Sequence, residues 1–297
     1  MDYVLKTNNL TKRFGFKKAV NGVSMTIRRG EIYGFIGKNG AGKTTLMRMV
    51  LGAAVPSGGS IELFGGEDLA TARLRIGSLL ESPNLYKNCS AFENLKRFSL
   101  LTGNSNEDIR SILRFVGLAD TGSKKVGNFS LGMKQRLGIA IAMLGHPDFL
   151  ILDEPVNGLD PEGIHSIRDL IIRLNRDLGI TVLVSSHLLD ELSKIVTTYG
   201  IINNGVLVEE ISARELVEKC RRKLLITVDN VDKAVGVIKS SLGNVALGIS
   251  GNTVIVDSHL EASGMLNDAL VKSGVTVLEL RRQTDTLENY FLERIGG

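Results

Sequence analysis

The chain has 297 residues, of which 43% are apolar and 23% charged, and its net charge is +4. This length and balance are typical of a globular protein with one large domain or two ordinary ones. No apolar run is long enough to span a membrane, and the first residues lack a signal-peptide core. From these features we expect a chain that is neither membrane-spanning nor secreted, a protein of the cytosol or of the inner face of a membrane.

Residues 3–9 and 23–27 are predicted to form short strands around a turn that contains two aromatic residues among basic ones. Either Phe14 or Phe16 can stack on a nucleobase, because an aromatic face adheres to a base without reading its identity. The alternative for each is an ordinary core residue at a strand end.

Residues 32–45 predict a buried strand, a glycine-rich turn and a helix. The spacing Gly37-x-x-x-x-Gly42-Lys43-Thr44 is that of a P-loop, in which backbone N–H groups and a helix N-terminus hold phosphate oxygens. Lys43 is expected to reach the β- and γ-phosphates and Thr44 to bind Mg²⁺. The alternative is a plain glycine turn before a core helix. The residues expected to bind the triphosphate are Gly37, Asn39, Gly40, Ala41, Gly42, Lys43, Thr44 and Thr45.

Two further strands are predicted at residues 60–64 and 76–80, and the second ends at Glu81. A polar residue that closes a strand beside a phosphate site can reach the metal ion or its water. Strands followed by strand–helix alternation indicate an antiparallel sheet beside a parallel core. The segment 91–117 has helical periodicity, with Ser105 or Asn106 as a cap. To this point a kinase or a GTPase remains possible.

Residues 129–144 form a small-residue loop and a helix, and the apolar run 149–152 then leads into Asp153 and Glu154. Carboxylates at the end of a buried strand lie where open α/β sheets bind ligands. Asp153 is expected in the Mg²⁺ site, and Glu154 is placed to accept a proton from the attacking water. A solvated acidic turn is the alternative. The predicted strand 181–184 is followed by His187, which can contact the γ-phosphate, although a lone histidine is usually structural.

These motifs together resemble the nucleotide-binding subunit of an ABC transporter, from Met1 to about Lys219. The resemblance implies an α/β P-loop NTPase core with an antiparallel β subdomain and a helical subdomain at about 82–146. It assigns the Walker A motif to residues 37–45, the signature loop to 129–133, the end of the Walker B strand to Asp153 and Glu154, the D-loop to 156–160, the switch histidine to His187 and the adenine-stacking aromatic to Phe14.

The resemblance also implies that two copies pack head to tail, with each ATP between one P-loop and the partner's signature loop. Ser130 and Gly132 are then expected to contact the γ-phosphate held by the other copy, and Asp160 belongs to the same nucleotide site. Catalysis is assigned to Glu154, His187 and Lys43. The implied cofactors are ATP and Mg²⁺, and the metal ligands are Thr44, Asp153 and Glu81.

Two departures from the family pattern narrow the resemblance. The usual LSGGQ signature is Phe-Ser-Leu-Gly-Met here, and Glu81 replaces a glutamine that binds Mg²⁺ and faces the membrane subunit. Both features resemble the branch that exports bacitracin and lantibiotic-type peptides for self-protection.

Residues 220–297 are predicted to form a small α+β domain in the order β-α-β-β-α-β, a split βαβ unit, with a last helix. Its strands are expected at residues 223–228, 245–249, 253–256 and 275–280. That helix has an apolar face of Leu287, Phe291 and Ile295, with Tyr290 beside it. We expect a second subunit to cover part of this face.

The sequence therefore predicts an ATP-hydrolysing subunit on the cytoplasmic face of the cell membrane. Its expected partners are multi-span membrane subunits and a second copy of itself, and no nucleic acid is expected. The rival is a soluble ABC-type ATPase that acts as a mechanical clamp on nucleic acid or ribosomes, but such relatives carry a second nucleotide domain, a coiled-coil insertion or zinc-binding cysteines. A regulatory module without turnover is a third possibility, which would require a defective Glu154 site.

Overall fold

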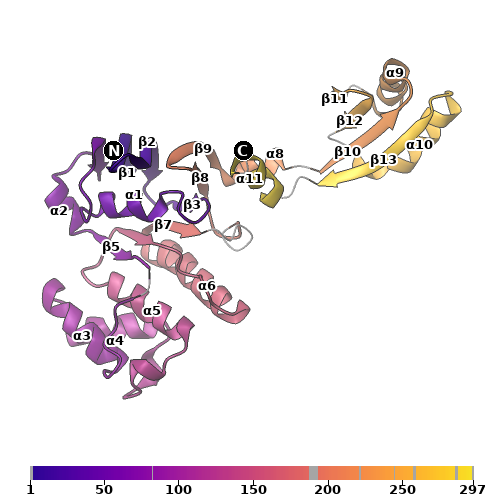
Figure 1. Cartoon of the computed structure of the whole chain (residues 1–297). Helices are drawn as coiled ribbons and strands as arrows, with labels where there is room; N and C mark the ends of the chain where they lie inside the picture. The colour runs from indigo at the N-terminus through magenta and orange to yellow at the C-terminus, as the bar shows by residue number, and fades with distance from the viewer. Residues whose placement is uncertain are drawn as a thin grey trace. The chain divides into compact units, whose positions relative to one another are not determined.

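The computed structural model describes residues 3–81, 83–186, 193–220, 222–243, 245–256, 259–284 and 287–295 (Figure 1). The chain divides into two compact units. The first contains Met1–Ala213 together with Glu293–Gly297, and the second contains Arg214–Leu292. The domain boundary that the sequence predicts, after Lys219, thus falls inside the second unit, and the end of the chain returns to the first.

A six-stranded sheet forms the centre of the first unit, and every residue of three of its parallel strands, at 32–36, 149–152 and 181–186, is buried. Such strands are buried on both faces, which is why the sequence shows continuous apolar runs instead of alternation. In spatial order the strands are β5 (Ile76–Leu79), β6 (Phe149–Leu152), β7 (Thr181–Ser186), β3 (Ile32–Ile36) and β8 (Thr198–Asn203), with β9 (Val206–Ser212) antiparallel at the edge.

A separate antiparallel sheet confirms the second layer that the strand pattern predicts. Its order is β2 (Lys17–Arg28), β1 (Tyr3–Phe14) and β4 (Gly58–Leu63). One buried apolar cluster connects this sheet, the helix α1 (Lys43–Val50) and the parallel sheet, and it includes Leu10, Leu46 and Phe35. The glycine-rich turn before α1 is therefore anchored on both sides by packed core.

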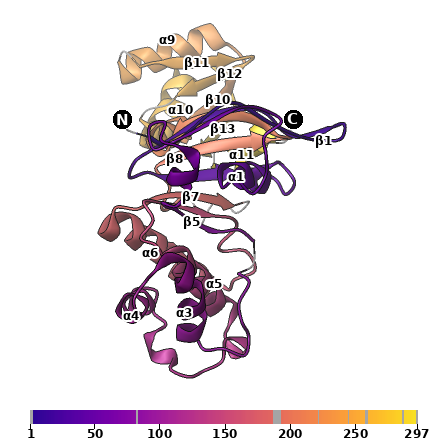
Figure 2. The ribbon, with the colours of Figure 1, turned by 90° about the vertical axis from the view of Figure 1, so that its left-hand side faces the viewer.

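Three helices between β5 and β6 form the predicted helical subdomain: α3 (Ala91–Thr102), α4 (Asn106–Phe115) and α5 (Leu131–Ala142). They lie on the opposite side of the parallel sheet from β1 and β2 (Figure 2). Ser105, not Asn106, caps α4, because its hydroxyl accepts a hydrogen bond from Asp108 N while the Asp108 carboxylate accepts one from Ser105 N. Two further helices described in this unit are α2 (Leu69–Arg73) and α6 (Pro161–Leu178).

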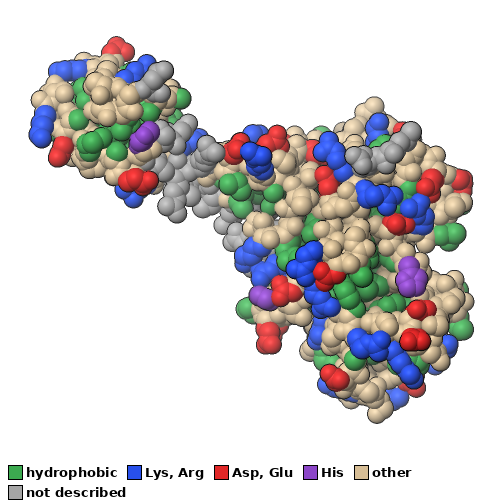
Figure 3. All heavy atoms as spheres, turned by 180° about the vertical axis from the view of Figure 1, so that it is seen from behind, with side chains coloured by type: hydrophobic (Ala, Val, Ile, Leu, Met, Phe, Trp, Pro, Cys, Tyr) green, Lys and Arg blue, Asp and Glu red, His purple; other side chains and the backbone are tan. Residues whose placement is uncertain are grey.

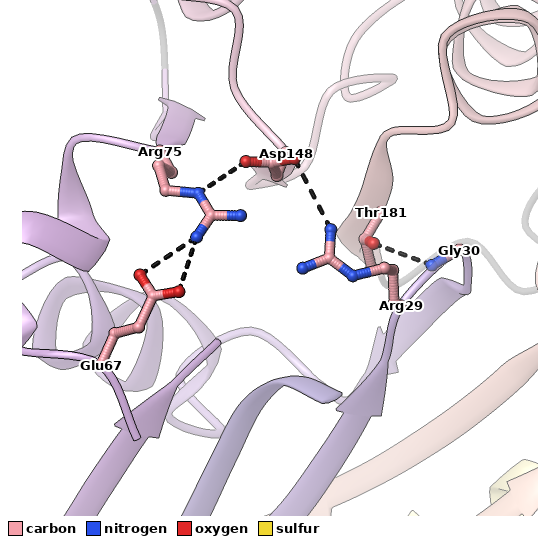
Figure 4. Close-up of polar contacts among 6 residues, drawn as sticks. All are labelled: Arg29, Gly30, Glu67, Arg75, Asp148 and Thr181. Carbon is pink, nitrogen blue, oxygen red and sulfur yellow. Dashed lines mark hydrogen bonds and ion pairs between the residues drawn. The ribbon is translucent and has the colours of Figure 1, made fainter. Parts of the chain in front are cut away.

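An ion-pair network joins the segments that precede the parallel strands (Figure 4). Arg75 donates to Asp148 at 2.7 Å and to Glu67 at 2.8 Å, and Arg29 lies 3.6 Å from Asp148. Arg75 also stacks 4.2 Å from the ring centroid of Phe64. The hydrogen bond from Arg75 to the Asp148 carboxylate raises the pKa of this guanidinium. Asp148 is thus the carboxylate that holds two arginines at the end of the sheet opposite the P-loop.

We expect Asp148→Ala to lower the free energy of unfolding by about 1–2 kcal/mol, because two half-exposed arginines would lose their shared partner. Urea unfolding measures this change. Arg176→Ala is the matched control, since it removes an exposed pair with Asp177 at 2.7 Å and is expected to stay within about 0.5 kcal/mol of wild type. Equal effects of the two substitutions would contradict a stabilising role of the network.

The second unit has the predicted split βαβ order. Its four-stranded antiparallel sheet runs β11 (Leu247–Ser250), β12 (Thr253–Val256), β10 (Arg222–Val228) and β13 (Val277–Thr284). The helices α9 (Val231–Leu242) and α10 (Ser263–Lys272) supply the other half of its core through Ala234, Ile238, Leu266 and Leu270. Two more helices precede and follow the sheet, α8 (Ala213–Lys219) and α11 (Leu287–Ile295).

The aromatic residues of α11 are buried within the single chain, with exposed fractions of 7% for Tyr290 and 1% for Phe291. Lys219 of α8 donates a hydrogen bond to the Tyr290 hydroxyl at 3.2 Å, and Arg294 pairs with Glu209 of β9. Tyr290 and Phe291 are therefore covered within one copy, and the expectation that a second subunit covers part of the helix stays a prediction. Among the residues described, no helix is long and apolar enough to cross a membrane.

Candidate functional site

The P-loop connects β3 to α1, and two of its glycines have no room for a side chain. A Cβ on Gly37 would lie 2.3 Å from the carbonyl oxygen of Ile202, and a Cβ on Gly42 would lie 2.3 Å from that of Ala19. Gly42 also has φ 108°, a backbone conformation that favours glycine. The two glycines therefore fix the turn against β8 and β2, and the N-terminus of α1 points into the cavity that the turn encloses.

That cavity, of about 360 Å³, gathers the predicted nucleotide-binding residues. Residues 39–45 line it, together with Phe14, Lys17, Ala19 and Glu154. Phe14 is 58% exposed and Phe16 fully exposed, so neither is a core residue. Only Phe14 is among the lining residues, with Lys12 Nζ 5.2 Å from its ring centroid.

Lys43 lies at the floor of this cavity with only 5% of its side chain exposed. Its ammonium group donates to Gly37 O at 2.6 Å and to Lys38 O at 3.3 Å, and it lies 3.1 Å from Glu154 Oε1. A buried cation with carbonyl and carboxylate partners is well satisfied, and Lys43 is among the residues that line the cavity. The structure thus brings the lysine of the first motif to the carboxylate of the second.

Asp153 and Thr44 form the second contact between these motifs. Thr44 Oγ1 donates to Asp153 Oδ2 at 2.6 Å, and Asp153 is 2% exposed. Ser185, at the end of β7, donates to Asp153 Oδ1 and accepts a hydrogen bond from Glu154 N at 2.9 Å. Ser185 is not among the residues predicted for the site, although its position at a strand end in the same layer was the available signal.

The Thr44–Asp153 pair fits Mg²⁺, which prefers hard oxygen ligands and usually keeps only one or two from the protein. The part of the chain that is described has no group of three or more His, Cys, Asp or Glu side chains suited to a metal ion. A hydroxyl and a carboxylate in contact therefore suit a metal whose other ligands are triphosphate oxygens and water.

Glu81 does not join the Thr44–Asp153 pair. Its carboxylate is 63% exposed, lies 2.6 Å from Arg48 Nη2, and is not among the residues that line the P-loop cavity. His187, the predicted switch histidine, lies outside the described residues.

A second cavity, of about 450 Å³, contains the signature loop. Ser130 caps α5 by accepting a hydrogen bond from Met133 N at 3.2 Å, so the N-terminus of this helix opens into the cavity. Burial lowers the pKa of Arg136, which donates to the carbonyl oxygens of Val116 and Gly117 at the end of α4. The lining residues include Ser130, Leu131, Gly132, Met133, Arg136, Leu159 and Asp160.

The two cavities have no lining residue in common. One holds the P-loop, Phe14 and Glu154, and the other holds the predicted signature residues and Asp160. Each is built at a helix N-terminus, where backbone N–H groups favour an anion. A single copy therefore presents two separate cavities, each of which favours an anion.

Comparison with known proteins agrees with this geometry. The ABC transporter family model matches residues 20–157. The chain is 42% identical over 302 residues to the bacitracin transport ATP-binding protein BcrA of Bacillus licheniformis, covering 100% of this chain and 99% of the relative. It is 43% identical over 208 residues to the lantibiotic transport ATP-binding protein SrtF of Streptococcus pyogenes, covering 70% of this chain and 90% of the relative.

Among solved structures, cbiO1 of Clostridium perfringens, part of the ABC transporter complex cbiONQ, superposes with a TM-score of 0.67 at 27% identity. This superposition covers 74% of this chain and 92% of that protein, whereas the BcrA match extends over the whole chain. The fold, the paired motifs and the BcrA match over the whole chain all indicate the same family. The chain belongs to the ABC transporter family, as one of its ATP-binding, ATP-hydrolysing subunits.

Proposed function

We propose that two copies of this chain bind ATP head to tail and drive a membrane exporter of antimicrobial peptides from the cytoplasmic face of the membrane. The observation that carries this proposal is the separation of the two half-sites. The P-loop cavity has a base and a lysine but no signature loop, and the signature cavity has no P-loop. Head-to-tail pairing joins one half-site from each copy.

In this arrangement Lys43 and the P-loop N–H groups hold the β- and γ-phosphates, and Thr44 and Asp153 hold Mg²⁺. The metal ion neutralises charge on the phosphate oxygens when it is bound. Glu154 accepts a proton from the attacking water, and His187 contacts the γ-phosphate. Ser130 and Gly132 of the second copy contact the same phosphate from the far side. ATP binding therefore closes the dimer, and hydrolysis releases it.

A groove of about 550 Å³ in the helical subdomain supports a membrane partner. It begins two residues after Glu81, a position that the family resemblance assigns to the contact with the membrane subunit. Its aromatic wall is Tyr86 and Phe98, whose ring centroids lie 6.2 Å apart, and Lys87 and Lys134 lie at its margin. An apolar groove with cations beside it suits a short amphipathic segment that carries acidic residues.

The rival, a soluble clamp on nucleic acid, has less support. The three described helices between β5 and β6 have 12, 10 and 12 residues, so they form no long coiled-coil insertion. On the face shown in Figure 3, Lys and Arg side chains are interspersed with Asp and Glu instead of forming one basic area. A polyanion would favour a continuous basic surface.

The substrate class comes from the named relatives together with the Phe-Ser-Leu-Gly-Met signature and Glu81. We expect this chain, expressed with the membrane proteins of its transporter in a sensitive bacterium, to raise the inhibitory concentration of bacitracin or of a lantibiotic. The Glu154→Gln variant, expressed at the same level, is the control and is expected to give no protection. Equal sensitivity of cells with wild type and variant to both peptide classes would contradict the proposed substrate class.

A further inference from the structure

The first two residues of α5 make a reciprocal contact with two residues of the loop that precedes α6. A Cβ placed on Gly158 would lie 3.4 Å from Leu131 Cδ2, and a Cβ placed on Gly132 would lie 3.8 Å from Leu159 Cδ2. The leucine of each segment therefore lies beside the glycine of the other, and all four residues line the signature cavity. We call this arrangement the reciprocal contact.

A short segment of chain links the reciprocal contact to the proposed base. Glu154 lines the P-loop cavity, whereas Gly158, four residues later, lines the signature cavity. Between them, Asn157 N donates to Glu154 O at 3.1 Å. Leu159 N then donates to Val156 O at 3.3 Å. Two successive hydrogen-bonded turns therefore connect the two cavities within one copy.

Leu131 is also the residue at which the signature departs from the usual LSGGQ, which has a glycine at this position. Its side chain is 44% exposed, so burial in the core does not account for it. The room beside Leu131 comes from Gly158, which has φ 75° and no side chain of its own. The leucine at 131 and the glycine at 158 are thus matched, and their contact restricts both loops.

We propose that Leu131 is a positioning residue that ties the signature loop to the segment carrying Glu154, and that this tie couples the two ATP sites of a dimer. The inference rests on the proposed head-to-tail pairing, in which the signature loop serves the partner's ATP and Glu154 serves the ATP of its own copy. Contact of the signature loop with one γ-phosphate fixes Leu131, and the reciprocal contact then fixes Glu154 at the other nucleotide. Each ATP thereby favours hydrolysis of the other.

The test is the ATP dependence of hydrolysis by the full-length chain, expressed as kcat and a Hill coefficient. Wild type is expected to have a Hill coefficient of about 1.5 to 2. Leu131→Ala should lower it to about 1 and reduce kcat about three- to tenfold, because each site then acts alone. Leu131→Met, which keeps a long apolar side chain, should stay closer to wild type than Leu131→Ala does. Leu159→Ala should have the same effects as Leu131→Ala, and the double variant should lose no more than either, since both side chains form one contact.

Leu178→Ala is the matched control, since Leu178 is 49% exposed and lines neither the P-loop cavity nor the signature cavity. Its kcat and Hill coefficient are expected to equal those of wild type. Sedimentation with ATP, in chains that also carry Glu154→Gln, shows separately whether Leu131→Ala still pairs. We expect that it does, because the reciprocal contact lies within one copy.

A dimer of Leu131→Ala whose Hill coefficient equals that of wild type would overturn the coupling and leave the pairing intact. A lower kcat with an unchanged Hill coefficient would overturn it too, because Leu131 would then only pack against its neighbours. Loss of the dimer in Leu131→Ala alone would make Leu131 an interface residue and contradict a tie within one copy. A Glu154→Gln chain that stays monomeric with ATP, or a wild-type Hill coefficient of 1, would also overturn the inference, and the former would overturn the pairing as well.

Discussion

Replacing Glu154 with glutamine is expected to reduce ATP turnover by at least about 100-fold and to leave ATP binding intact. The amide has nearly the same shape but cannot accept a proton from the attacking water. Lys43 keeps its hydrogen bonds to Gly37 O and Lys38 O, so the phosphate side of the cavity is preserved. Phosphate release measures turnover, and calorimetry measures binding.

Glu107→Gln is the matched control for this substitution, since Glu107 lies in the first turn of α4, outside both cavities. Its turnover is expected to equal that of wild type. Full turnover in Glu154→Gln would exclude Glu154 as the base. Another polar group around Asp153 would then have to accept the proton.

Lys43→Ala is expected to weaken ATP binding by about 10- to 100-fold, because charge-assisted hydrogen bonds to phosphate are roughly twice as strong as neutral ones. Lys43 is the lysine at the floor of the P-loop cavity, and it is almost fully buried. The affinity is measured by calorimetry, and the melting temperature is measured alongside, because Glu154 also loses its ion pair.

Lys38→Ala serves as the comparison, since Lys38 belongs to the same loop but its exposed side chain does not line the cavity. A small effect there with a large one at Lys43 is the expected pattern. Equal losses at both positions would indicate that the loop acts only through its total charge.

The buried strands and the P-loop could be predicted from the sequence because their signals are local. Residues 32–36 are apolar throughout and form β3 as expected, since a strand covered on both faces has no polar positions. In the second unit, Thr253–Val256 also has the predicted bounds, and Gly251 takes the left-handed turn before it. Local chemistry decides such elements, so a single sequence suffices.

Other elements were missed because their composition is mixed. Strands β8 and β9 were not predicted, and β9 alternates exposed and half-buried residues, including Glu209 and Glu210, along an edge. Strand β13 was predicted at 275–280 but spans Val277–Thr284, because Arg281 and Arg282 interrupt the apolar pattern. Pairing with β10 determines these residues, and periodicity alone does not reveal it.

Prediction of the candidate site from the sequence has the same limit. The motifs predicted that Lys43, Thr44 and Asp153 lie near a triphosphate. They did not predict the contacts that join these residues. The bridge made by Ser185 and the pairing of Glu81 with Arg48 depend on how strand ends and a helix face meet in space. A polar residue at a strand end is predicted to lie near the nucleotide site. The tertiary structure determines which partner its side chain contacts.

The most direct test of the proposed composite site is sedimentation of the Glu154→Gln chain with and without ATP. We predict a monomer without ATP and a dimer with it, since each half-site then completes the other. Gly132→Asp in the same chain is the informative addition, because a Cβ at Gly132 meets only ordinary contacts with Leu159 and Gly163 in its own copy. Its carboxylate would face the partner's γ-phosphate, so the double variant should bind ATP and stay monomeric. A Glu154→Gln chain that binds ATP as a monomer, or a double variant that dimerises equally well, would contradict the shared site.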